Sequence, residues 1–142
     1  MDDAVLALTL ARARIAIGAA AAIAPKLTAR IMSGGRGSDG IAPVFARMLG
    51  GRDVALGLGT VIALDRGKPV RGWLEGSALA DAVDFVACVR AREEMPSSVF
   101  GTSAGLAAGA ALLGVILSRR LDPPPSPHPG QPEAVATGHP SE

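Results

Sequence analysis

Arginines and aspartates recur inside segments of this chain that are otherwise apolar and long enough to cross a lipid bilayer. The charged residues of the first three such segments are Arg12, Arg14, Arg47, Arg52, Asp53, Glu75, Asp81 and Asp84. Carboxylates in such surroundings can take up and release protons or small cations, and nearby guanidinium groups control whether they stay ionised. The chemistry that these residue types suggest is therefore proton or ion transfer, or the binding of a small polar molecule between helices.

The spacing of the charges brings several of them to one level. Counted from helix starts near residues 4, 43 and 70, Arg14, Asp53 and Asp81 each lie about ten residues along a helix, and antiparallel packing then places them at similar depth. Arg52 adjoins Asp53, and Asp84 follows Asp81 by one helical turn. We predict that these five residues form a charge network between the helices.

Three interpretations of this network stay open. In the first, arginines and aspartates neutralise one another and fix the helix register, which the equal numbers of positive and negative charges in the three segments favour. In the second, Asp81 and Asp84 titrate, and Arg14 or Arg52 sets their charge. In the third, short or tilted helices let the arginines reach the interface and leave the network solvated. We expect the first, a structural or accessory membrane protein; the alternative is a small transporter or a proton- or ion-conducting protein that uses Asp81 and Asp84.

Four apolar segments must position the network. The clearest, about 98–118, contains no charged residue, and its length matches the hydrocarbon core of a bilayer. The others run over about 4–24, where Pro25 ends the helix, and over about 43–64 and 70–91. No segment alternates with a period of two, so we predict no strands. Short turns make neighbouring segments antiparallel, and the predicted fold class is all-α, a four-transmembrane-helix up-down bundle over residues 1–120.

The composition changes at residue 121. Seven of the eleven prolines fall in 121–142, too many for a packed element, so we predict a disordered proline-rich tail. Both histidines, His128 and His139, lie in this tail and so cannot serve as a positioned base or as a metal ligand. A PxxP match at 124–127 is expected in any proline-rich stretch and is read as part of a solvated tail.

Several function classes lack support in the composition. A formal charge of +1 gives no basic surface for nucleic acid, and a single cysteine, Cys88, excludes an internal disulfide and a thiolate metal cage. Thr60, Ser77 and Cys88 are nucleophiles by type only, without an identifiable base, and Cys88 is read as a packing residue. We therefore predict no enzyme, no cofactor and no metal. Trp73, near a helix end, is expected at the membrane interface.

Small residues at four-residue spacing predict where helices approach closely. The composition, 49% apolar with only 3% aromatic residues, favours such packing. In the last segment Gly101, Gly105 and Gly109 form a doubled GxxxG, which we interpret as a helix-packing face for a membrane-protein partner or for a second copy of the chain. A comparable row in the second segment consists of Arg47, Gly51, Ala55 and Gly59.

Three sequence stretches together resemble a known family. They are Leu-Gly-Gly-Arg-Asp-Val-Ala-Leu-Gly-Leu-Gly at 49–59, Arg-Gly-Trp-Leu at 71–74 and Ala-Asp-Ala-Val-Asp at 80–84. This pattern is similar to a family of small bacterial four-helix integral membrane proteins of unknown function. The likeness covers about residues 10–120 and excludes the tail. It implies the four-helix architecture and the Arg-Asp and Asp-x-x-Asp elements, but no activity.

The expected location is the cell membrane, with several spans and the lipid bilayer as a partner. The acidic start Asp2-Asp3 is unlike the basic beginning of a secretory signal, so we expect the first helix to be retained. Basic residues flank both ends of the helices equally, which leaves the orientation open. An acidic N-terminus and an even number of spans favour both termini in the cytoplasm.

Overall fold

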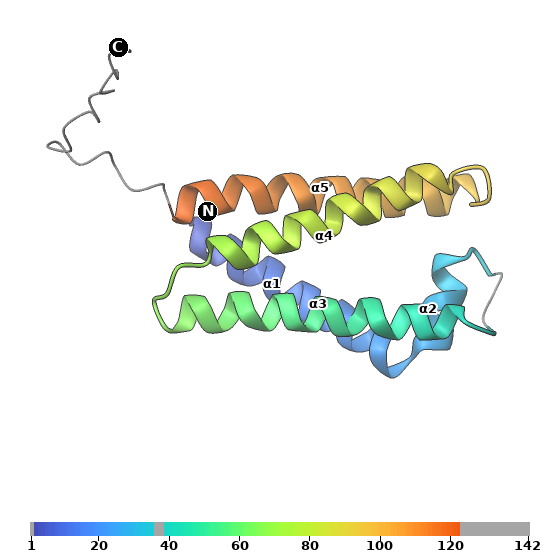
Figure 1. The fold of residues 1–142 in the computed structure, drawn as a ribbon, viewed down its shortest axis with the longest axis horizontal. Coiled ribbons are helices and arrows are strands. Elements are labelled where there is room, and N and C mark those ends of the chain that lie inside the picture. Colours follow the sequence, from blue (N-terminus) through green and yellow to red (C-terminus); the bar gives the residue numbers. More distant parts are fainter. Residues whose placement is uncertain (1, 36–38, 123–142) are drawn as a thin grey trace, which may run out of the picture.

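The computed structural model describes residues 2–35 and 39–122, which form helices and no strand (Figure 1). The elements are α1 (Asp3–Ile23), α2 (Pro25–Met32), α3 (Ala42–Asp65), α4 (Arg71–Arg90) and α5 (Ser97–Leu121). The all-α prediction is confirmed. The predicted disorder of 123–142, together with His128 and His139, lies outside the described residues.

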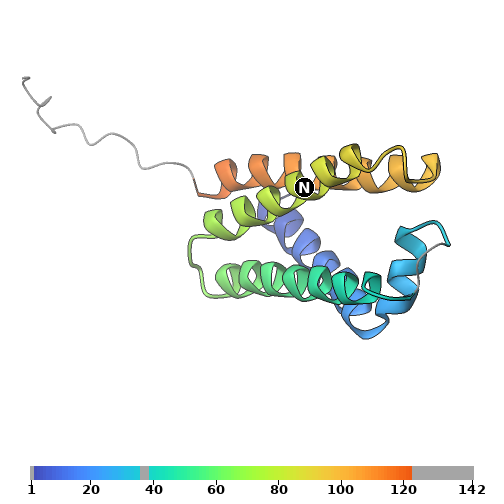
Figure 2. The ribbon, with the colours of Figure 1, turned by 45° about the vertical axis from the view of Figure 1, so that its right-hand side comes forward.

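The four long helices form two antiparallel pairs rather than an evenly packed bundle. α1 packs along α3 and α4 packs along α5, whereas the contacts between the two pairs are less extensive. The chain direction alternates from one long helix to the next, so α1 begins at the same end of the molecule at which α5 finishes (Figure 1). Two views show the pairs meeting at that end and diverging toward the other (Figures 1 and 2). Whatever joins the pairs is therefore important for the fold.

An apolar cluster joins the two pairs at the end where they meet. Its buried members are Ala7, Ala63, Val70, Leu74 and Leu117, and Leu6, Leu10, Leu64 and Leu121 pack against them. The cluster takes side chains from α1, α3, α4 and α5. Because Leu121 belongs to it, the helical part of the protein continues past residue 120, where the sequence placed the start of the tail.

Local backbone chemistry fixes the turn between α3 and α4. Gly67 has a φ of 57°, the left-handed conformation that glycine adopts without strain at a helix end. In this conformation the N–H of Lys68 donates to the carbonyl of Ala63 at 2.8 Å. On the other side of the turn, the carboxylate of Asp122 accepts a hydrogen bond of 2.6 Å from the N–H of Arg71, which caps the first turn of α4.

The interior of the protein consists mainly of small residues, and the large apolar side chains face outward. Buried positions of the long helices include Ala11, Gly18, Ala46, Gly50 and Ala78. By contrast, Leu79 is 68% exposed and Leu106 is 71% exposed. Water-soluble folds bury their large aliphatic residues first and rarely leave them in broad exposed arrays. The helices approach through small residues and present large apolar ones to their surroundings.

Glycines on α1 and α3 allow the backbones of these two helices to come into direct contact. A Cβ atom at Gly18 would lie 2.6 Å from the carbonyl oxygen of Gly50 and 2.9 Å from the amide nitrogen of Val54. Real Cβ atoms do not approach other atoms so closely, so only glycine fits at this crossing. The small-residue row predicted on α3 contained the neighbouring Gly51 instead of Gly50. A Cβ atom at Gly51 would meet nothing within 4 Å.

Among the described residues, the doubled GxxxG of α5 packs against no other helix. A Cβ atom at Gly101, Gly105 or Gly109 would also meet nothing within 4 Å. Within the described part of the protein, the glycine through which α5 contacts α4 is Gly114, whose Cβ would lie 3.2 Å from the carbonyl oxygen of Leu74. The predicted packing face of α5 is therefore left open.

Candidate functional site: an arginine–aspartate network across three helices

The structure brings the five predicted network residues together. Arg14 comes from the middle of α1, Arg52 and Asp53 from the middle of α3, and Asp81 and Asp84 from α4. They form one continuous chain of ion pairs in the order Asp81, Arg14, Asp53, Arg52, Asp84. Both ends of this chain lie on α4, one helical turn apart. The network therefore ties α4 to the pair formed by α1 and α3.

Both arginines bind two carboxylates. Arg14 donates from Nη1 to Oδ1 of Asp53 at 3.0 Å and from Nη2 to Oδ2 of Asp81. Arg52 donates to both oxygens of Asp84, at 3.1 and 2.7 Å, and to Oδ1 of Asp53 at 3.1 Å. A bidentate guanidinium–carboxylate contact, as between Arg52 and Asp84, fixes the orientation of both side chains as well as pairing their charges. Asp53 is the shared acceptor that links the two arginines.

The helix crossing described above positions the network. Arg14 lies four residues before Gly18, on the same face of α1, and Asp53 lies three residues after Gly50 on α3. The Cβ atom of Asp53 is itself one of the atoms nearest to Gly18, at 3.0 Å from the position of an added Cβ. Close approach of the two backbones therefore places the Arg14 guanidinium within reach of the Asp53 carboxylate.

Burial changes along the network. The side chain of Asp81 is only 9% exposed, whereas that of Asp84 is 36% exposed. The network thus has a buried end at Asp81 and an accessible end at Asp84. It also contains three aspartates and two arginines, so it carries one excess negative charge when all five groups are ionised.

The other charged residues of the three segments lie outside the network. Arg12 is exposed, and Nε of Arg47 donates to the carbonyl oxygen of Ala22 at 3.3 Å. Glu75 pairs with Arg71 at 2.7 Å on an exposed surface of α4. The equal charge count that favoured a neutral network is therefore wrong for the network itself, because these three residues contribute one negative and two positive charges elsewhere.

Within the described residues, the potential nucleophiles are not part of a recognisable catalytic arrangement. The hydroxyl of Thr60 donates to the carbonyl of Leu56 at 3.0 Å, a bond within its own helix, and Ser77 is buried. Cys88 is a free, partly buried cysteine. Across residues 2–35 and 39–122, no three His, Cys, Asp or Glu side chains are arranged to hold a metal ion. The prediction that the chain is not an enzyme stays a prediction.

Two helices have the length and composition of membrane spans. They are α1 and α5. The sequence predicted four spans, and the difference lies in the charges of the other two helices, since α3 contains Arg47, Arg52 and Asp53 and α4 contains Glu75, Asp81 and Asp84. Entry of α3 and α4 into a bilayer would require their charges to be paired inside the protein.

Comparison with known proteins gives no family. No family model matches the chain, and neither a curated protein nor a solved structure matches it. The resemblance to a family of small four-helix membrane proteins stays a prediction that depends on residues 49–59, 71–74 and 80–84.

Proposed function

We propose that this chain is a small integral membrane protein that crosses the cell membrane with its four long helices and has a structural or accessory role. The observation that carries the proposal is the distribution of side chains: small residues lie inside, large apolar residues face outward, and the mid-helix charges of α3 and α4 are turned toward other helices and paired. A lipid environment favours this arrangement, because close backbone packing rather than water exclusion holds helices together there.

The dimensions of α3 and α4 suit a bilayer. They contain 24 and 20 residues, which at 1.5 Å per residue corresponds to about 36 and 30 Å. The hydrocarbon core is about 30 Å thick. An unpaired Asp or Arg at the centre of a span costs about 2.5 to 3.5 kcal/mol, and pairing within the network offsets part of that penalty.

The network itself supports a structural role. Each of its carboxylates accepts from an arginine, and within the described residues no buried side-chain nitrogen or oxygen lacks a hydrogen-bond partner. Since the two helix pairs otherwise meet mainly at one end, the network is the second junction between them. We infer that it sets the register of α4 against α1 and α3.

The open face of α5 supports an accessory role. Gly101, Gly105 and Gly109 lie on one helix face, and a Cβ atom at any of them would meet no described atom within 4 Å. Such a face suits a membrane-protein partner or a second copy of the chain. The proposal includes several spans with both termini in the cytoplasm. It includes no nucleic acid, cofactor, metal or enzymatic activity.

Labelling of single cysteines in intact membranes tests whether α4 spans. Cys88 is the only cysteine, so a Cys88→Ser background can carry one new cysteine at a time. We expect Val83→Cys, which is exposed in the middle of α4, to resist a membrane-impermeant maleimide until detergent is added. Lys68→Cys, in the turn before α4, should label from one side of intact membranes. Equal labelling of both positions before solubilisation would contradict the proposal.

A second candidate function is a small transporter or proton- or ion-conducting protein. The observation that favours it is the excess carboxylate of the network, together with the accessible position of Asp84. A network of three acids and two arginines becomes neutral as a whole when it takes up one proton or one monovalent cation. In this function Asp84 would receive the ion and Asp81 would be the buried end of the path.

Flux in proteoliposomes tests the second function. If it is correct, the purified protein should make sealed vesicles permeable to protons or to a monovalent cation, and Asp84→Asn should return the flux to that of protein-free vesicles. Glu75→Gln is the matched control, because Glu75 is an exposed acid on the same helix outside the network. The structural role predicts no flux from the unmodified protein or from either variant. Flux that survives Asp84→Asn would refute a path through Asp84.

A further inference from the structure

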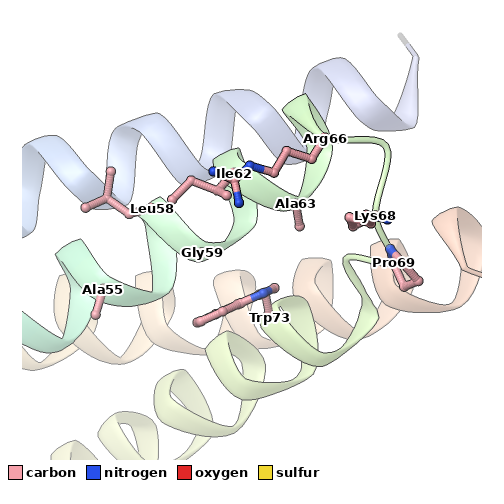
Figure 3. A pocket seen from close by; sticks show the side chains of 9 residues that line it. All are labelled: Ala55, Leu58, Gly59, Ile62, Ala63, Arg66, Lys68, Pro69 and Trp73. Atoms are coloured by element: carbon pink, nitrogen blue, oxygen red, sulfur yellow. The ribbon is translucent and has the colours of Figure 1, made fainter.

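A groove outside the network runs along the surface between α3 and α4. It has a volume of about 410 Å³, within the range of small-molecule sites. Leu58 and Ile62 of α3 form one wall and Trp73 of α4 forms the other (Figure 3). All three side chains are exposed, so the groove opens sideways from the helices rather than into the interior.

The wall formed by Trp73 is fixed by its contact with α3. A Cβ atom at Gly59 would overlap the indole ring, so the ring lies directly on the backbone of α3. The absence of a side chain at residue 59 therefore makes room for the ring and lets the groove form beside it. Near the end of a helix, a tryptophan in this position is typical of the boundary between hydrocarbon and headgroups.

Two basic residues border the groove near the α3–α4 turn. Arg66 and Lys68 both line it, and the Arg66 side chain runs back along α3 toward Ile62 (Figure 3). Neither of these two residues takes part in an ion pair with any described carboxylate, whereas Arg71 nearby is paired with Glu75. The groove thus joins apolar walls along the helices to a cationic end formed by Arg66 and Lys68, which no described carboxylate pairs with.

We propose that this groove binds one molecule of an anionic phospholipid from the bilayer. The phosphate lies between Arg66 and Lys68, and an acyl chain follows Leu58 and Ile62 with Trp73 on its other side. The inference rests on the proposed function, because a lipid reaches this groove only if α3 and α4 lie in a membrane.

The shape and charge of the groove favour a lipid over a water-soluble anion. A small anion would contact only the cationic end and leave the apolar walls unfilled. An amphiphile instead places its charge at the helix end and its chain along the helices, which is the direction that a bilayer imposes. Basic pockets at the ends of membrane helices recognise anionic headgroups in this way.

Trp73 provides a reporter at the site itself. It is the only tryptophan, and the chain has no tyrosine, so the fluorescence of the intact protein comes from the wall of the groove. The full chain is reconstituted in phosphatidylcholine vesicles that contain a small, matched mole fraction of either brominated phosphatidylglycerol or brominated phosphatidylcholine. Bromine quenches tryptophan only at short range, so quenching reports which lipid occupies the groove.

We expect brominated phosphatidylglycerol to quench more strongly, with a local enrichment over phosphatidylcholine of about fivefold if one basic residue contributes about 1 kcal/mol and about thirtyfold if both do. Arg66→Gln with Lys68→Gln should abolish the difference. The matched control is Arg119→Gln with Arg120→Gln, a basic pair at the same end of the molecule but outside the groove, which should retain it (Figure 1).

Three other outcomes overturn the inference in distinguishable ways. Equal quenching by the two lipids in the unmodified protein would show insertion without headgroup selection, so the lipid site would be wrong while the proposed membrane location stands. No quenching by either lipid would show that Trp73 is not near acyl chains, and both proposals would fail. Loss of selection in the Arg119 and Arg120 control would assign the effect to general surface charge instead of to the groove.

Discussion

Arg14→Leu is expected to destabilise the protein more than any other single replacement of a charged residue. The change removes the arginine bound to Asp81, whose side chain is 9% exposed, and one of the two described arginines bound to Asp53. Breaking a buried ion pair by removing one partner costs about 3 to 5 kcal/mol, since the remaining charge is left without compensation. The free energy of unfolding in mixed micelles and the yield of monodisperse protein should both fall.

Two matched variants separate the network from a general effect of arginine. Arg12→Leu removes an exposed arginine one half-turn away on the same helix and should leave the free energy of unfolding nearly unchanged. Combining Arg14→Leu with Asp81→Asn removes the orphaned charge and should recover most of the loss. Equal destabilisation by Arg12→Leu and Arg14→Leu, or no recovery in the double variant, would mean that the ion pairs do not stabilise the fold.

The composition of the network could be predicted from the sequence because helix geometry fixes depth. Residues near the middle of antiparallel helices must meet at one level, whatever their detailed packing, and this placed Arg14, Asp53 and Asp81 together. Which acid meets which arginine could not be predicted, because that depends on helix rotation. Arg47 is an example: it points to a backbone carbonyl of α1 rather than to a carboxylate.

The sequence predicts where the helices lie along the chain better than it predicts how they pack. Apolar length and prolines predict the helices, but the division into two pairs depends on which glycines touch another backbone. Both Gly50 and Gly51 fit a small-residue row, and a one-residue difference is a rotation of about 100° around the helix. The groove beside Trp73 could not be predicted for the same reason, because its walls depend on which sides of α3 and α4 face each other.

The adjacent glycines Gly50 and Gly51 should respond in opposite directions to the same change. Gly50→Ala places a methyl group 2.8 Å from the amide nitrogen of Ala22 and against the carbonyl oxygen of Gly18. These are backbone atoms that cannot rotate away, so α1 and α3 must separate. Overpacking of this kind costs about 1 to 3 kcal/mol, and often more when the backbone has to move.

Gly51→Ala adds the same methyl group where nothing lies within 4 Å. Alanine in a helix interior is favoured over glycine by about 0.5 to 1 kcal/mol, so this variant should be as stable as the original protein or more stable. The free energy of unfolding of the two variants, measured side by side in the same detergent, gives the comparison.

Because Gly50 lies one turn before Asp53, Gly50→Ala should also weaken the Arg14–Asp53 pair. Adding Arg14→Leu to Gly50→Ala should therefore lower the free energy of unfolding by less than Arg14→Leu does alone. Fully additive losses, or equal effects of the two alanines, would show that the crossing of α1 and α3 does not position the network.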